Sequence, residues 1–176
     1  MITASKIETV AGSMIACSVD EGICLLEFAD EKDSGSRYSF LEKYFGMPVA
    51  EGENECLLNL HTQLSEYFSG TRKKFTVKLV TPGTPFQQSV WKELLNIDYG
   101  KTRSYIQQAS ALGMPRSVRA VANANGQNKI AILIPCHRVI GSDGSLTGYA
   151  GGLEKKKWLI EHERRFSGQA YDLTVF

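Results

Sequence analysis

The sequence has no long apolar run and little excess charge of either sign. Of its 176 residues, 43% are hydrophobic and 22% are charged, which are ordinary values for a globular protein. No stretch approaches the roughly 20 apolar residues that a membrane-spanning helix needs, so no membrane association is expected. Because the first residues lack the apolar core of a secretory signal, we expect the chain in the cytoplasm, or in the nucleus if its source is eukaryotic.

Cysteines are few and widely spread, and no CxxC pair occurs. Cys17, Cys24 and Cys56 are expected to be buried structural thiols in a reducing compartment. A zinc site that combined Cys17, Cys24 and His61 would match the spacing of no common closed site. The sequence therefore predicts no metal and no cofactor.

The net charge of +1 conceals an uneven distribution along the chain. Residues 1–82 carry 8 lysines and arginines against 12 aspartates and glutamates, whereas residues 83–176 carry 12 against 7. A basic second half suits an acidic partner, DNA included, although many basic faces are only solvated surface.

Residues 1–80 have the pattern of a small α/β domain. Two short apolar runs, 14–19 and 23–28, flank a turn that contains Gly22 and predict a β-hairpin. Residues 75–80 alternate with period two and predict a third strand.

Two helices are expected in the same domain. Apolar side chains recur at helical spacing over 38–45 and again over 56–68, where Gly70 follows as a stop signal. This half of the sequence shows no chemistry of its own.

Residues 81–85 form the clearest linker in the chain. They separate a predicted first domain, 1–80, from a second, 86–176. A helix is expected to begin here, because Thr84 can cap it and Gln87 sits where a capping box requires it.

Two more predicted helices suggest a helix-turn-helix. Ser104 caps the first, which runs through Ala111; residues 113–115 form a turn; and residues 116–124 form the second helix. This is the outline of a DNA-binding helix-turn-helix, with an ordinary helical hairpin as the alternative. The candidate DNA contacts on the second helix are Arg116, Ser117, Arg119 and Asn123.

The apolar run 130–134 leads directly into Pro135, Cys136 and His137. We expect this run to be a buried strand or segment. A free thiol has a pKa of about 8.5 and is mostly protonated at neutral pH, so a nucleophilic Cys136 would need a base. His137 could serve, directly or through one water. A buried inert cysteine beside a structural histidine is the alternative.

A glycine-rich loop and a helix follow this segment. The loop, 147–152, carries Tyr149 and could close over a flat ligand. The helix, predicted over 153–163, ends at Glu163. That carboxylate could orient His137 as the third member of a Cys-His-acid array, although the sequence alone does not place the two together.

Six segments follow one another along the second half of the chain: FQQSVW at 86–91, Ser104 with Tyr105, RAV at 119–121, IPCHRVI at 134–140, GYAGGL at 148–153, and Trp158 with His162 and Glu163. Taken together, these motifs resemble the O6-alkylguanine-DNA alkyltransferases, and the similarity covers roughly residues 84–163. It implies a ribonuclease H-like first domain, α/β with a small antiparallel sheet, and a mainly α, winged-helix-like second domain that contains the helix-turn-helix.

The resemblance implies direct reversal of DNA alkylation damage by a single-turnover methyltransferase. An alkyl group would pass irreversibly from O6-alkylguanine in double-stranded DNA to Cys136, so that one molecule repairs one lesion. O4-alkylthymine is a second candidate lesion, and we expect a monomer. No cofactor is implied.

The resemblance also implies roles for individual residues. His137 and Glu163 match a pair that removes the thiol proton through a water, and Asn128 matches an asparagine that braces the active-site turn. Tyr105 matches a tyrosine that protonates the guanine ring as the bond breaks. Arg119 matches an arginine that fills the gap left by a base flipped from the stack, on a helix that lies in the minor groove.

The resemblance implies that Val139 and Tyr149 form walls of the alkylguanine pocket and that the backbone amide of Ala150 contacts O6. At the position of Ala150 the family often carries serine, so a backbone amide remains but a hydroxyl is missing.

Two rival functions remain open from the sequence. A cysteine hydrolase would turn over an acyl substrate through a thioester. A non-enzymatic DNA-binding module could recognise lesions, but it would not need Cys136.

Overall fold

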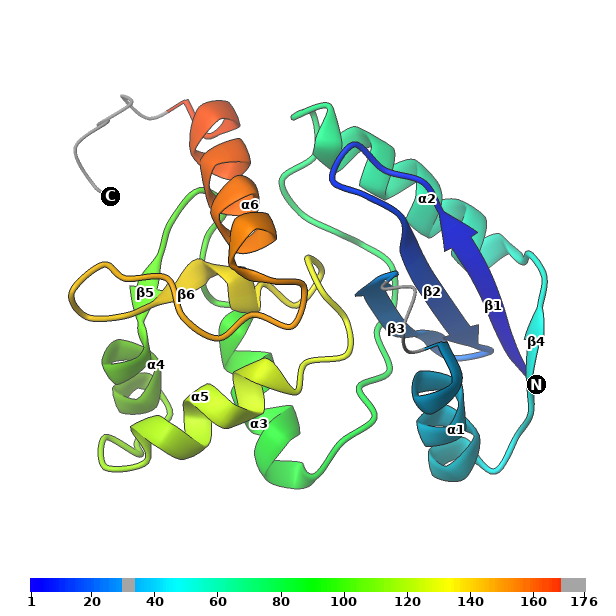
Figure 1. Ribbon diagram of the computed structural model, residues 1–176, viewed down its shortest axis with the longest axis horizontal. Helices are drawn as coiled ribbons and strands as arrows, with labels where there is room; N and C mark the ends of the chain where they lie inside the picture. Colours follow the sequence, from blue (N-terminus) through cyan, green and yellow to red (C-terminus); the bar gives the residue numbers. More distant parts are fainter. Residues whose placement is uncertain (30–33, 169–176) are drawn as a thin grey trace. The chain divides into compact units, whose positions relative to one another are not determined.

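The computed structural model describes residues 1–29 and 34–168. They fall into two compact units (Figure 1), one made of Met1–Pro82 with Lys129–Ala131, the other of Gly83–Asn128 and the chain from Ile132 onward. Residues 169–176 of the predicted second domain lie outside the described residues. Within the described part of the chain, no helix is both long and apolar enough to cross a membrane.

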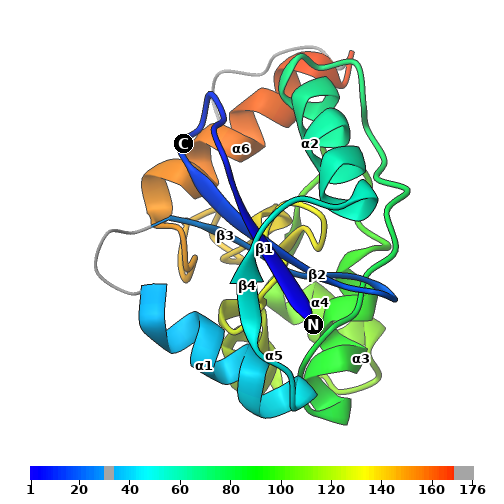
Figure 2. The same cartoon turned by 90° about the vertical axis from the view of Figure 1, so that its right-hand side faces the viewer.

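The first unit is built on a four-stranded sheet in the order β3-β2-β1-β4. The predicted hairpin is confirmed by β2 (Met14–Val19) and β3 (Gly22–Phe28), and β1 (Ile2–Ile7) pairs antiparallel with β2. The short strand β4 (Val49–Glu51) pairs parallel with β1 (Figure 2). The sheet is therefore mixed, whereas an antiparallel sheet was expected.

The predicted strand over 75–80 is wrong. A single β-bridge joins Leu79 to Ile23, and two backbone hydrogen bonds, Ile23 N to Lys78 O (2.9 Å) and Val80 N to Ile23 O (2.8 Å), fasten the segment to β3. The alternation reflects packing beside a helix, because the Phe75 ring lies 5.4 Å from that of Tyr67. Burial of alternate side chains can thus give the sequence pattern of a β-strand in a segment that is not paired along its length.

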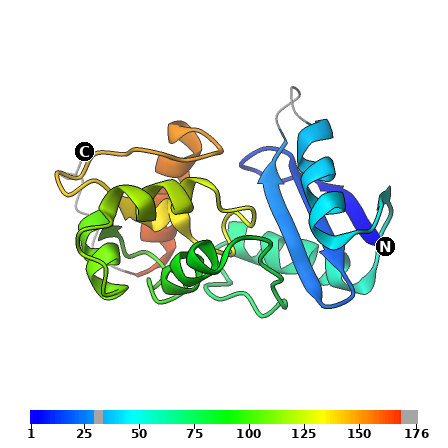
Figure 3. The ribbon, with the colours of Figure 1, turned by 90° about the horizontal axis from the view of Figure 1, so that it is seen from below.

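Both predicted helices of the first unit are present, as α1 (Ser34–Phe45) and α2 (Glu55–Phe68). Helix α1 lies beside the strands of the sheet (Figure 3). Its Leu41 is fully buried in the core formed with the sheet. Burial raises the pKa of the core thiols Cys17 and Cys24 to about 12, in keeping with inert structural thiols. Cys56 differs from the expectation because it is only half-buried.

The second unit contains four α-helices within the described residues, with two short parallel strands, β5 (Arg103–Ser104) and β6 (Val139–Ile140). The capping boxes predicted at Thr84 and Ser104 are both formed. A capping box is a local interaction, which is why its sequence signature succeeded. The helices are α3 (Pro85–Leu94), α4 (Tyr105–Ala111), α5 (Val118–Gly126) and α6 (Leu153–Phe166).

The segment 130–134 is buried as expected, but it is not a strand. Only Ile130 forms a bridge, to Leu26 within the first unit. The chain then turns, and Ile132 takes φ +70°, a left-handed conformation that is rare for a β-branched residue. This turn leads into the 3₁₀ helix η1 (Cys136–Arg138), which carries the expected nucleophile.

Candidate active site

Cys136 lies in η1 with only 9% of its surface exposed. The Asn128 side-chain amide lies between two parts of this turn: its Nδ2 donates to Ile134 O at 2.8 Å and to Cys136 Sγ at 3.2 Å. Asn128 thus holds the sulfur and the backbone before it together, as the bracing role requires.

The environment of the Cys136 thiol favours its protonated form. Burial raises the pKa of Cys136, whereas the Asn128 amide and the Lys156 charge act in the opposite direction. A base is therefore needed to make this sulfur a nucleophile.

His137 and Glu163, which are far apart in the sequence, are in contact. His137 Nε2 lies 2.7 Å from Glu163 Oε1, and both side chains are almost fully buried. Burial lowers the pKa of His137, although the Glu163 charge opposes the shift. Because a carboxylate can only accept, Nε2 carries the proton of the neutral ring, which leaves Nδ1 as the basic atom. Among the described residues, Nδ1 has no hydrogen-bond partner.

Glu163 is surrounded by donors. Arg138 donates to it through Nε (2.8 Å) and Nη2 (3.0 Å), and the Gly100 amide donates at 3.0 Å. Burial alone would raise the pKa of Glu163, but His137 and Arg138 hold it well below its usual range. The carboxylate is therefore ionised, and Arg138 is its counterion.

Tyr105 and Lys156 form a second polar cluster. The Tyr105 hydroxyl donates to Thr147 O at 2.9 Å, and Lys156 Nζ donates to Thr147 O (2.6 Å) and to the Tyr105 hydroxyl (3.2 Å). Lys156 is fully buried, and burial lowers its pKa to about 8, with the Cys136 charge opposing the shift. A titratable lysine therefore lies beside the expected proton donor.

Sequence reasoning missed Arg138 and Lys156. Arg138 was part of the motif that carries Cys136, but its side chain had no evident partner. Lys156 belongs to a run of three lysines that has the appearance of a solvated face. Helical periodicity could have identified it, because Lys156 and Glu163 lie seven residues apart, on one face of α6.

The three residues expected to form the pocket differ in their exposure. Val139 is fully buried and Tyr149 is half-buried, whereas Ala150 is exposed. Burial of its hydroxyl raises the pKa of Tyr149 well above its usual range, and the charge of Cys136 adds to the shift. Tyr149, like Tyr105, is therefore within electrostatic range of the sulfur.

The helix-turn-helix has a packed inner side and a polar outer side. Gln108 of α4 and Asn125 of α5 are buried and exchange two side-chain hydrogen bonds, of 3.0 and 2.6 Å. The predicted second helix begins at Val118, later than expected, and Ser117 makes no side-chain cap. Of the candidate DNA contacts, Ser117 is half-buried, and those exposed to solvent are Arg116, Arg119 and Asn123.

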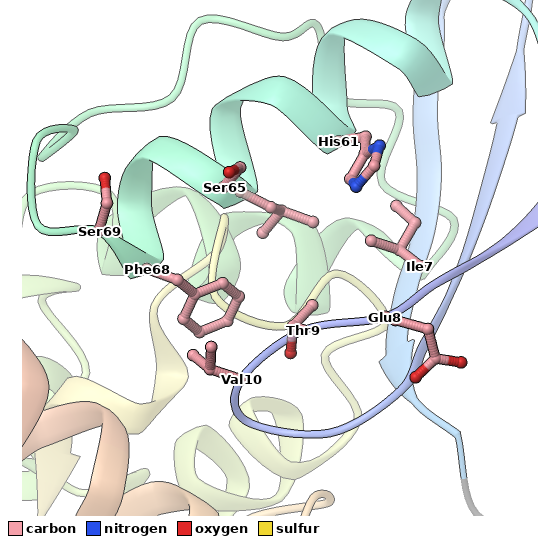
Figure 4. Close-up of a pocket in the computed structure, with 9 residues that line it drawn as sticks. Ile7, Glu8, Thr9, Val10, His61, Ser65, Phe68 and Ser69 are labelled. Carbon is pink, nitrogen blue, oxygen red and sulfur yellow. The ribbon is translucent and has the colours of Figure 1, made fainter.

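The first unit contains a pocket of about 320 Å³ between the end of β1 and α2 (Figure 4). None of the predicted site residues lines it. Within residues 1–29 and 34–168, no group of three or more His, Cys, Asp or Glu side chains is placed to hold a metal ion. The lining residues are Ile7, Glu8, Thr9, Val10, His61, Leu64, Ser65, Phe68 and Ser69.

A helix-turn-helix with outward arginines, on the unit that holds a buried thiol, imidazole and carboxylate, defines a class of DNA-binding proteins with a cysteine nucleophile. Residues 85–165 match the family model described as 6-O-methylguanine DNA methyltransferase, DNA binding domain.

Individual relatives agree with this match. The methylated-DNA–protein-cysteine methyltransferase of Mycobacterium bovis is 54% identical over 114 residues, 65% of this chain and 68% of that protein. The protein of that name from Methanosarcina barkeri is 44% identical over 158 residues, 89% of this chain and 94% of its own. A crystal structure of Mycobacterium tuberculosis OGT in complex with DNA superimposes with a TM-score of 0.80 at 36% identity, covering 93% of this chain and 94% of that one. The chain belongs to the methylated-DNA–protein-cysteine methyltransferase family, and the predicted resemblance is confirmed.

Proposed function

We propose that this protein repairs DNA by moving an alkyl group from O6-alkylguanine in a duplex to the sulfur of Cys136, once per molecule. Membership of the family supports the reaction type. The observation that carries the assignment of residues is the buried array in which Asn128 holds Cys136 while Glu163 holds His137.

Activation of the thiol begins with His137. Its Nδ1 is the basic atom of the ring, and no direct hydrogen bond joins it to the sulfur within the described residues. One water molecule between them would carry the proton from Sγ to Nδ1. Glu163, kept ionised by Arg138, would stabilise the imidazolium that forms.

Transfer then forms one bond and breaks one. The Cys136 thiolate attacks the alkyl carbon, a C–S bond forms, and the bond between that carbon and O6 breaks. A neutral guanine leaves far more readily than an anionic one, so a proton should reach the base as the bond breaks. Tyr105 supplies this proton in the proposal, and the Lys156 ammonium beside its hydroxyl would stabilise the tyrosinate that remains.

Replacing Tyr105 by phenylalanine tests the proton donor. General acid catalysis of this kind contributes about 10²–10⁴-fold, so we expect Tyr105→Phe to slow transfer by about 10²-fold. The measurement is the single-turnover rate with a duplex that carries O6-methylguanine. Tyr44→Phe, on an exposed ring of α1, is the control and should leave the rate unchanged. A Tyr105→Phe rate equal to wild type would remove Tyr105 from the mechanism.

Base extrusion is assigned to α5. Flipping a nucleotide costs about a few kcal/mol, least when its pairing is already weakened by damage. Arg119 is exposed on the first turn of α5, where it can enter the stack and fill the gap. The minor groove displays little sequence information, which suits a protein that acts at any sequence.

Arg119→Ala should separate extrusion from chemistry. We expect it to slow transfer from a duplex by about tenfold or more, because part of the extrusion cost is no longer offset. Transfer from single-stranded DNA should stay near wild type, since no gap opens there. Arg116→Ala removes the same charge from an exposed neighbouring site and should affect both substrates alike. If Arg119→Ala slowed transfer equally from duplex and single-stranded DNA, Arg119 would be assigned a contact to phosphate and not a role in base extrusion.

A further inference from the structure

The first unit, although acidic overall, has one concentrated basic segment. Half of the 8 lysines and arginines in residues 1–82 fall within residues 72–78, and no aspartate or glutamate occurs between Glu66 and Glu93. The segment lies outside residues 85–165, which match the DNA-binding family model. We call residues 72–78 the basic strip.

The basic strip is held in place at several points. Buried Gln63 of α2 accepts from Thr76 N and donates to Thr76 Oγ1, both at 2.8 Å. At one end Arg72 forms an ion pair with Glu66, and at the other Lys78 O accepts from Ile23 N at 2.9 Å. An ordered segment loses little conformational freedom when it meets a partner, which favours binding.

Two lysines of the strip present their charge to solvent. Glu66 neutralises Arg72, but Lys74 and Lys78 are exposed. Asp20 and Glu21, in the turn before Gly22, make no ion pair with Lys78 within the described residues. Lys74 and Lys78 are four residues apart along the chain, so their backbones are at most about 14 Å apart.

We propose that the basic strip binds the phosphate backbone of duplex DNA, as a second contact outside the helix-turn-helix. This inference rests on the proposed function, because it takes DNA to be the partner of the protein. Duplex DNA carries one charge per roughly 1.7 Å of axis, so two lysines at this spacing can each meet a phosphate. Only residues 79–82 separate Lys78 from the second unit, which keeps the strip close along the chain to the unit that holds α5.

The test compares two double variants of the full-length protein. Lys74→Gln with Lys78→Gln removes two charges from the strip, and Lys6→Gln with Lys43→Gln removes two exposed charges elsewhere in the first unit. The affinity for a short unmodified duplex is measured over a range of salt concentrations. Each phosphate contact contributes about 0.9 to the slope of log K against log salt. We expect the slope of the strip variant to fall by about 1 to 2 and that of the control to match wild type.

Further measurements distinguish failure of the basic-strip proposal from failure of the proposed function. The single-turnover transfer rate at saturating lesion DNA should remain at the wild-type value in the strip variant, because the strip does not touch the reacting atoms. An unchanged slope would overturn the proposal, and so would an equal fall in the control pair, which would mean a general effect of net charge. A wild-type protein that binds no DNA would instead refute the proposed function.

Discussion

Cys136→Ser is expected to abolish alkyl transfer while leaving DNA affinity at the wild-type value. A hydroxyl is far less acidic than a thiol and a much weaker nucleophile toward an alkyl carbon, although its size is similar. The substitution leaves the exposed polar face of α5 unchanged. After mixing with O6-methylguanine DNA, the intact mass of the wild-type protein should increase by one methyl group, and that of Cys136→Ser should not change.

The other thiols provide matched controls for this result. Cys56 is half-buried and lies on α2, so Cys56→Ser should accept one methyl group as the wild type does. Peptide mapping should place the methyl on Cys136 alone, because burial raises the pKa of Cys17 and Cys24 to about 12. A methyl group found on any other cysteine, or transfer that persists in Cys136→Ser, would refute the assignment.

The same experiment distinguishes the proposed reaction from hydrolysis. A cysteine hydrolase passes through a thioester that water cleaves, so it would regenerate its thiol and turn over repeatedly. A thioether is not readily hydrolysed. The amount of repaired DNA should therefore equal the amount of protein, and a product yield that exceeds it would favour a hydrolase.

Glu163→Gln is expected to be the most destabilising conservative substitution in the second unit. It keeps the shape of the side chain but leaves Arg138 buried without its counterion. Breaking a buried ion pair in this way costs about 3–5 kcal/mol, which urea unfolding would measure directly. Glu161→Gln is the control, because its pair with Lys157 is exposed, and it should cost about 0.5 kcal/mol or less.

The same variant should also lose activity beyond its loss of stability. A glutamine amide can donate to His137 Nε2, which would favour the tautomer with the proton on Nδ1 and block the basic atom. In a comparable catalytic triad, replacing the carboxylate by an amide leaves the histidine in the wrong tautomer and lowers kcat by about 10⁴-fold. We therefore expect the transfer rate of Glu163→Gln to fall by about 10²-fold or more. Single-turnover rates should be compared where both proteins are folded. A folded Glu163→Gln protein with wild-type transfer would show that the carboxylate does not orient the base.

Protonation of Glu163 should contribute to the loss of stability at acid pH. Its pKa in the folded protein is held below the usual value of 4.5, so below that pH the unfolded chain binds the proton first. Stability present above pH 4.5 is therefore lost as the pH falls toward the folded-state pKa. Urea unfolding across this range should show a steeper fall for the wild type than for Glu163→Gln, and identical slopes would contradict the assigned shift.

Local signals in the sequence predicted much of the fold. The helices capped by Thr84 and Ser104 were placed correctly because a capping box involves residues three apart. The strands β1 and β4 were not anticipated, since the pairing of a short strand depends on a partner distant in the sequence. The strand considered over 130–134 is absent for a related reason. The run is apolar because it is buried, and burial alone does not distinguish a strand from a turn.

The identity of the reacting groups could be inferred from residue types and their order, because a thiol, an imidazole and a carboxylate have the same chemistry wherever they occur. Their ionisation could not. Whether Glu163 reaches His137, whether Arg138 offsets its charge, and whether Lys156 is buried beside Tyr105 all depend on α6 packing against η1 and the loop before it. The free energy of a charge is set by the groups that surround it in space, and those groups come from segments far apart along the chain.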